Sequence, residues 1–175
     1  DSDIYFGTFA KSFASIGAFI AGNEDMVRYL RYNMRSQIFA KSLPMPLVVG
    51  ARKRLKMIKT MPELKDQLWI IANALQKGLV DAGFNIGTTN TQVTPVVLEG
   101  GLGEATNLTL DLRENHGLFC SIVVYPVIPR GMIILRLIPT AMHTLEDVEY
   151  TIETFKKVHS KLLAGEYKSD EIAAV

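Results

Sequence analysis

The spacing of apolar residues along the chain predicts a succession of helices and strands. Apolar residues recur every three or four positions in five stretches, residues 24–39, 47–59, 62–82, 104–115 and 145–163. This spacing gathers them on one face of an amphipathic helix. Shorter apolar runs, typical of strands, occupy residues 4–6, 92–98, 118–125 and 132–138. We therefore predict an α/β fold class in which helices pack on one face of a short sheet.

Residues with known preferences for helix ends mark several boundaries. Asn23 and Thr144 precede two of the predicted helices, and their side-chain oxygens suit the N-cap position. Pro62 suits the first turn of a third helix. Gly83 suits the position that follows the end of that same helix.

Composition and charge narrow the classes of function. The chain has 175 residues, 48% of them hydrophobic, and a formal net charge of +1. This is enough apolar material for one good core, without the basic excess typical of nucleic-acid binding. The single cysteine, Cys120, excludes an internal disulfide and predicts a buried thiol in a cytoplasmic protein. No apolar run is long enough to predict a membrane span, and the start does not resemble a signal peptide.

The first candidate for chemistry is Lys11. Residues 4–6 predict the end of a strand, Gly7 and Thr8 predict a turn, and the small residues that follow leave little bulk over the lysine. Apolar surroundings disfavour the ammonium form of a lysine, so its amine can attack a carbonyl group. The alternative is a surface lysine after a strand, because most lysines are solvated.

The segment around this lysine resembles a known family. Residues 7–12, Gly-Thr-Phe-Ala-Lys-Ser, are similar to the Gly-Thr-x-x-Lys segment of the α-oxoamine synthases, which are pyridoxal 5'-phosphate (PLP) enzymes of fold type I. The resemblance implies that Lys11 binds PLP covalently through its amine. It also implies that Thr8 contacts the phosphate of the cofactor.

A second segment, residues 39–44, resembles the family's aromatic-Ser-x-Ser-Leu/Met-Pro motif. In the family this motif crosses the interface of a homodimer and contacts the phosphate of the neighbouring subunit's cofactor. Here the two contacting positions are Ala40 and Lys41, so the hydroxyl expected at the first is lost. Backbone N–H groups remain, and the Lys41 ammonium suits a phosphate as a point charge. The alternative for Lys41 is a solvated loop lysine.

A third pair of motifs lies near the end of the chain. Residues 125–131, Tyr-Pro-Val-Ile-Pro-Arg-Gly, resemble a turn of the family's glycine C-acetyltransferases, and residues 136–143 resemble its Arg-x-x-x-(Ser/Thr/Asn)-Ala-x-His segment. The resemblance implies that Arg136 binds the α-carboxylate of the amino acid substrate. An arginine in an otherwise apolar strand is costly unless it is paired, and a structural ion pair is the alternative.

The resemblance also implies a domain organisation. Residues 1–45 correspond to the end of the large PLP-binding domain, residues 46–167 to the small C-terminal α/β domain, and residues 168–175 to a frayed tail. The N-terminal half of a family member has no counterpart here. We therefore expect this piece to be inactive without that half.

The implied reaction condenses a small amino acid, serine or glycine, with an acyl-CoA to give an α-amino ketone. Motifs around Lys11 favour an enzyme similar to serine palmitoyltransferase, of sphingolipid type. Glycine C-acetyltransferase, also called 2-amino-3-ketobutyrate CoA ligase, and 8-amino-7-oxononanoate synthase are alternatives. A folded interaction domain without catalysis is an alternative of another class.

Overall fold

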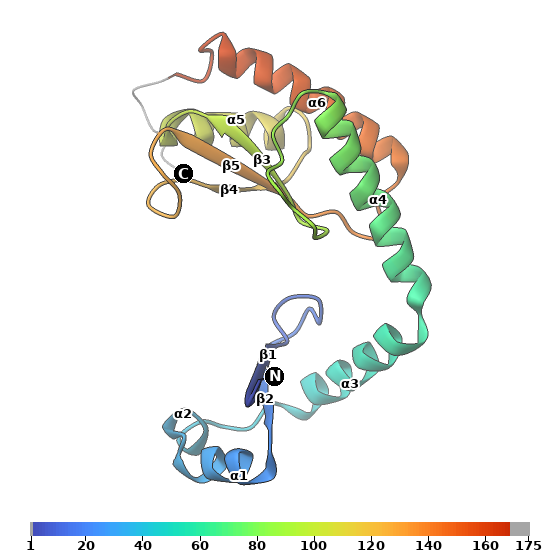
Figure 1. Cartoon of the computed structure of the whole chain (residues 1–175), viewed down its shortest axis with the longest axis vertical. Helices are drawn as coiled ribbons and strands as arrows, with labels where there is room; N and C mark the ends of the chain where they lie inside the picture. The colour runs from blue at the N-terminus through green and yellow to red at the C-terminus, as the bar shows by residue number, and fades with distance from the viewer. Residues whose placement is uncertain (1, 169–175) are drawn as a thin grey trace. The chain divides into compact units, whose positions relative to one another are not determined.

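The computed structural model of the chain describes residues 2–168, which form two compact units that divide after Pro62 (Figure 1). The sequence predicted a domain boundary at residue 45, one helix earlier. The boundary between the domains of the whole protein stays a prediction. Of the predicted tail, all but Lys168 lies outside the described residues.

The first unit begins with a β-hairpin. Strands β1 (Ile4–Thr8) and β2 (Ala18–Gly22) pair antiparallel, with Thr8 opposite Ala18. The predicted turn at Gly7 and Thr8 was therefore wrong, because both residues continue the ladder. The second strand was not predicted, since Ala18, Ala21 and Gly22 have low β propensity and leave only Phe19 and Ile20 as a strand signal.

Three helices complete this unit. They are α1 (Glu24–Asn33), α2 (Arg35–Ile38) and α3 (Met45–Thr60). Asn23 caps α1 as predicted, and its side chain accepts a hydrogen bond from the Met26 amide at 2.8 Å. The helix predicted to run to residue 39 breaks at Met34, whose extended backbone ends α1. The break was not predicted, because the residues around Met34 include no Pro or Gly.

The first unit has almost no interior of its own. Among its described residues none is buried, and large apolar side chains are open, such as Phe6 at 65%, Tyr32 at 72% and Phe39 at 80% exposure. Its helices α1, α2 and α3 contain no buried residue. The surfaces of this unit therefore suit further protein contacts.

The second unit contains three helices and a three-stranded sheet. The helices are α4 (Pro62–Asp81), α5 (Leu102–Glu114) and α6 (Leu145–Leu163). The strands are β3 (Thr94–Glu99), β4 (Ser121–Val123) and β5 (Met132–Leu137), in the antiparallel order β3-β5-β4. Pro62 begins α4, Gly83 follows its end with φ of 85°, and Thr144 caps α6. These helix ends confirm the predictions.

One face of this sheet carries the core. Val96 and Leu98 of β3 lie opposite Leu135 and Ile133 of β5, and all four are buried. The helices contribute the rest of one continuous cluster, which includes Ile71, Leu75, Leu79, Leu108, Leu112, Phe155, Val158 and Leu162. The opposite face of the sheet is partly exposed. A mixed α and β fold with helices on one face of a short sheet is thereby confirmed (Figure 1).

A charged network ties α5 to the end of α6. Asp111 is buried and accepts hydrogen bonds from the Lys161 amine at 2.8 Å and from the Tyr167 hydroxyl at 2.5 Å. Burial opposes ionisation of Asp111, but hydrogen bonds from Lys161, Tyr167 and Asn115 outweigh it and lower the carboxyl pKa to about 2. Burial and the bond to Asp111 raise the pKa of Tyr167.

Two further expectations from the sequence concern the burial of Cys120 and the length of the apolar helices. Cys120 is buried as predicted, and burial raises the pKa of its thiol to about 11. None of the helices within residues 2–168 is both long and apolar enough to cross a membrane.

Candidate active site

Lys11 lies in the loop that joins β1 to β2. Backbone hydrogen bonds hold this loop, from the Phe9 amide to the Gly17 carbonyl at 2.9 Å and from the Ser15 amide to the Phe9 carbonyl at 2.9 Å. The Ala14 amide also donates to the carbonyl of Lys11 at 2.8 Å. The backbone of the lysine is therefore fixed, while its side chain is left free to reach outward.

Aromatic rings pack beside this loop. The ring centroid of Phe9 lies 5.3 Å from that of Phe13 and 5.5 Å from that of Phe19. The Phe19 ring lies directly over Gly7, where an added Cβ would come within 2.4 Å of it. Packing against Phe19 therefore explains why the Lys11 motif has a glycine at position 7, since any larger residue would collide with this ring.

The surroundings of Lys11 differ from the expected apolar pocket. Lys11 is exposed, and no ion pair or side-chain hydrogen bond engages its amine within residues 2–168. Side chains from other parts of the protein would have to supply the rest of an enclosed site.

Thr8 lies on the same hairpin. Its hydroxyl accepts a hydrogen bond from the Ala10 amide at 3.1 Å and donates to the Gly17 carbonyl at 3.4 Å. Ser15, on the opposite side of the loop, has a buried hydroxyl oxygen without a partner in the described part of the chain. Polar groups that suit an anion are therefore close to the lysine along the chain.

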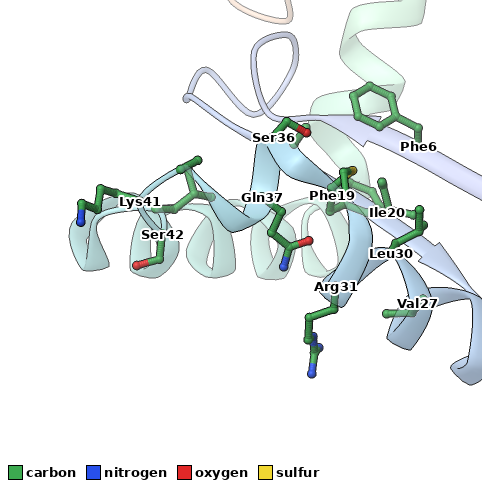
Figure 2. Close-up of a pocket in the computed structure, with 14 residues that line it drawn as sticks. Phe6, Phe19, Ile20, Val27, Leu30, Arg31, Ser36, Gln37, Lys41 and Ser42 are labelled. Atoms are coloured by element: carbon green, nitrogen blue, oxygen red, sulfur yellow. The ribbon is translucent and has the colours of Figure 1, made fainter.

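A cavity of about 730 Å³ lies within the first unit, between the hairpin and the helices that follow it. Phe6, Phe19 and Leu30 form part of its apolar wall (Figure 2), and Ala40 and Lys41 also line it. Figure 2 shows Lys41 and Ser42 on one side of the cavity, away from apolar side chains such as Phe6 and Leu30. The structure thus brings Ala40 and Lys41 to one cavity, whereas Thr8 and Lys11 do not line it.

Arg136 belongs to the second unit, on the central strand β5. Strand alternation directs it away from the core face, so its side chain is exposed although the strand is otherwise apolar. Its Nε donates a hydrogen bond to the Ser121 hydroxyl at 3.0 Å. No acidic side chain within the described residues forms an ion pair with it. The structural ion pair considered for Arg136 is therefore absent from this part of the protein.

The donor set suits PLP in part. A free primary amine at Lys11 matches the aldehyde, and the Thr8 hydroxyl, backbone N–H groups and the Lys41 ammonium suit the phosphate. The pyridine nitrogen of PLP also needs a carboxylate partner, and none of the family motifs identified in this chain contains one. Across residues 2–168 no three His, Cys, Asp or Glu side chains gather in a way that could hold a metal ion.

Sequence reasoning missed Ser121 as a residue of this site. The one sequence feature that could have placed it is its position next to Cys120. Because Cys120 is buried and side chains alternate along a strand, Ser121 points to the other face of the sheet. Nothing in the sequence pattern indicated that this face would bring it beside Arg136.

Comparison with known proteins gives matches over nearly the whole chain. Residues 1–155 match the family model for aminotransferase class I and II. Cysteate-C-fatty acyltransferase from Capnocytophaga ochracea is 60% identical over 167 residues, which are 95% of this chain and 40% of that protein. The 8-amino-7-oxononanoate synthase from Alkaliphilus oremlandii is 34% identical over 160 residues, 91% of this chain and 40% of that protein.

Among solved structures, serine palmitoyltransferase from S. paucimobilis with bound PLP-myriocin superimposes with a TM-score of 0.81 at 28% identity. The match covers 93% of this chain and 41% of that one. The chain therefore spans about 40% of the length of the proteins it matches.

Proposed function

Because this chain belongs to the aminotransferase class I and II family, in which it is similar to α-oxoamine synthases, we propose that its full-length parent is a PLP-dependent acyltransferase. The parent condenses a small amino acid with an acyl-CoA to give an α-amino ketone. The observation that carries the proposal is Lys11, an exposed amine with a fixed backbone, in a segment similar to the family's Lys motif.

The basic residues of the chain have separate tasks in this proposal. Lys11 would hold the cofactor at Nζ, and the same Nζ, when not bonded to the cofactor, would accept the α-proton of the substrate. PLP, when bound, supplies an electron sink for the negative charge left on the α-carbon. Arg136 binds and orients the α-carboxylate of the amino acid.

The phosphate site is assigned to Thr8, Ala40 and Lys41. The Thr8 hydroxyl serves the cofactor of its own subunit, while the Ala40 backbone and the Lys41 ammonium serve that of the neighbouring subunit. This assignment is supported by the exposure of Ala40 and Lys41, which line the same cavity. A homodimer follows from it, because each site needs residues from both copies.

The identity of the amino acid is open among three candidates. The sequence motifs favoured serine, with glycine as the alternative. The relative at 60% identity is named for cysteate, an amino acid whose side chain carries a sulfonate. We therefore place cysteate beside serine and ahead of glycine, with a fatty-acyl CoA as the acyl donor.

The test uses the full-length parent loaded with PLP. The absorbance of the cofactor is recorded while cysteate, serine and glycine are titrated in turn, and release of free coenzyme A from a long-chain acyl-CoA is then measured. We expect a spectral change with cysteate or serine, followed by coenzyme A release. A response to glycine and acetyl-CoA alone would favour the C-acetyltransferase alternative.

A pair of lysine variants identifies the attachment site. Borohydride reduction followed by mass mapping should find the cofactor on Lys11, and Lys11→Ala should abolish both the label and coenzyme A release. Lys53→Ala, which removes an exposed lysine of α3, should change neither. Label spread over surface lysines, with no spectral response to any amino acid, would instead support a non-catalytic interaction domain.

A further inference from the structure

The guanidinium of Arg136 is held by its neighbour across the sheet. Ser121 and Arg136 stand directly opposite each other in the β4–β5 ladder. Both side chains therefore project from the same face, and the Arg136 Nε to Ser121 Oγ distance is 3.0 Å. This face is the one opposite the core, so the hydrogen bond is open to a ligand.

The other neighbour of Arg136 offers no such contact. On the β3 side, Arg136 stands opposite Pro95, whose side chain has no hydrogen-bonding group. Of the two residues directly across the ladder from Arg136, Ser121 alone has a polar side chain. The direction of the guanidinium on this face is thus set from the β4 side.

The hydrogen bond leaves a defined set of donors for a ligand. A guanidinium has five N–H donors, one on Nε and four on the two terminal nitrogens. Ser121 takes the Nε donor, and within residues 2–168 no acidic side chain pairs with the other four. A carboxylate can therefore meet the two terminal nitrogens end-on, with two parallel hydrogen bonds.

We propose that Ser121 is a positioning residue for the amino acid substrate, which acts by holding Arg136 at Nε so that its terminal nitrogens face the α-carboxylate. This inference rests on the proposed function, because it takes Arg136 as the carboxylate site. An arginine side chain loses rotamer entropy when it binds a ligand. A hydrogen bond that holds it beforehand lowers that cost and tightens binding.

The test compares substrates with and without the carboxylate. In the PLP-loaded full-length parent, dissociation constants are taken from the cofactor's absorbance for the amino acid that binds and for its decarboxylated counterpart, taurine for cysteate or ethanolamine for serine. Ser121→Ala should raise the dissociation constant of the amino acid about three- to tenfold. It should leave that of the decarboxylated amine within about twofold, and Ser121→Thr should restore wild-type binding.

Two further variants separate positioning from a structural effect. In an Arg136→Lys background, Ser121→Ala should add nothing, because lysine has no Nε–H to hold. Ser160→Ala removes an exposed hydroxyl from α6 and should bind like the wild type. Thermal melting of each variant shows whether it is folded.

The possible results distinguish a failure of the role proposed for Ser121 from a failure of the role proposed for Arg136. If the wild type binds the amino acid and Ser121→Ala binds it with the same dissociation constant, the role of Ser121 is overturned. The proposed function is then unaffected. Equal weakening of the amino acid and the decarboxylated amine would also overturn it, since the effect would then not pass through the carboxylate. If Arg136→Lys binds the amino acid as the wild type does, the carboxylate role proposed for Arg136 fails, and the role of Ser121 fails with it.

Discussion

Single residues decide the chemistry of this chain through their immediate surroundings. Lys11 and Arg136 are both exposed basic residues without an acidic partner in the described structure, whereas Lys161 is tied to Asp111. An unpaired cation is available for an anionic or carbonyl ligand, and a paired one is not. Lys161 therefore stabilises the fold, whereas the family motifs distinguish Lys11 and Arg136 from other exposed basic residues such as Lys53.

The Asp111 network predicts a pH dependence of stability. The folded pKa of Asp111, about 2, lies below its ordinary value, so its contribution is complete above about pH 4 and is lost as the pH falls towards 2. A shift of this size corresponds to about 2 kcal/mol. Urea unfolding followed by the fluorescence of Trp69, the single tryptophan, should show this loss between pH 4 and pH 2.

Two variants control this measurement. Asp111→Asn should lower the free energy of unfolding at pH 7 and flatten its change between pH 4 and pH 2. Glu114→Gln, an exposed carboxylate on the same helix, should keep the wild-type profile. A wild-type profile for Asp111→Asn would show that the network contributes nothing to stability.

At the level of single elements, the start of α6 is the clearest case of local control. The Thr144 hydroxyl accepts a hydrogen bond from the Asp147 amide at 3.1 Å, and the Thr144 amide donates to the Asp147 carboxylate at 2.8 Å. Hydrogen bonds from the Thr144 backbone and side chain lower the pKa of Asp147. The cap therefore weakens when acid protonates that carboxylate.

Removal of this cap should destabilise the second unit. Thr144→Ala should lower the free energy of unfolding by about 1 kcal/mol, because the helix loses one partner for its free N–H groups. Thr144→Ser keeps the hydroxyl and should cost much less. Urea titrations of the three proteins at pH 7 measure the difference, and equal midpoints for Ala and wild type would contradict the cap's role.

Elements also show where sequence reasoning succeeded. The predicted limits of α6, residues 145–163, match those observed, because its cap and apolar spacing are local signals. The strand β2 was missed, because Ala18, Ile20 and Gly22 acquire strand conformation by pairing with β1. The break at Met34 was missed for a similar reason, since no Pro or Gly marks it.

For the molecule as a whole, the two units differ in how much interior they have. The second unit holds a continuous core on one sheet face, whereas no described residue of the first unit is buried. Protection of backbone amides from exchange depends on such cores. The two units should therefore open with different free energies.

Hydrogen exchange measures this difference. In the chain alone, amides of β3 and β5 should exchange slowly, and those of β1 and β2 should exchange much faster. In the full-length parent, the hairpin should gain protection, because its exposed apolar residues, such as Phe6, are then covered. Equal protection of both sheets in the chain alone would contradict this account.

The candidate site was predictable only residue by residue. Motif spacing identified Lys11, Thr8, Ala40, Lys41 and Arg136, and their roles stay predictions. The exposure of Arg136 was not predicted, because an apolar strand sequence does not tell which face packs on helices when both faces carry apolar residues. Its contact with Ser121 could not be predicted without the register between β4 and β5, because the two residues lie 15 positions apart in the sequence.

Local sequence signals were sufficient to predict the ends of α4 and α6 and the positions of the family motifs, because capping, periodicity and spacing are properties of neighbouring residues. The strand order β3-β5-β4, the hairpin around Lys11 and the open face that carries Arg136 became known from the three-dimensional structure. These features depend on contacts between residues distant in the chain. Such contacts arise from packing and register, which no local pattern specifies.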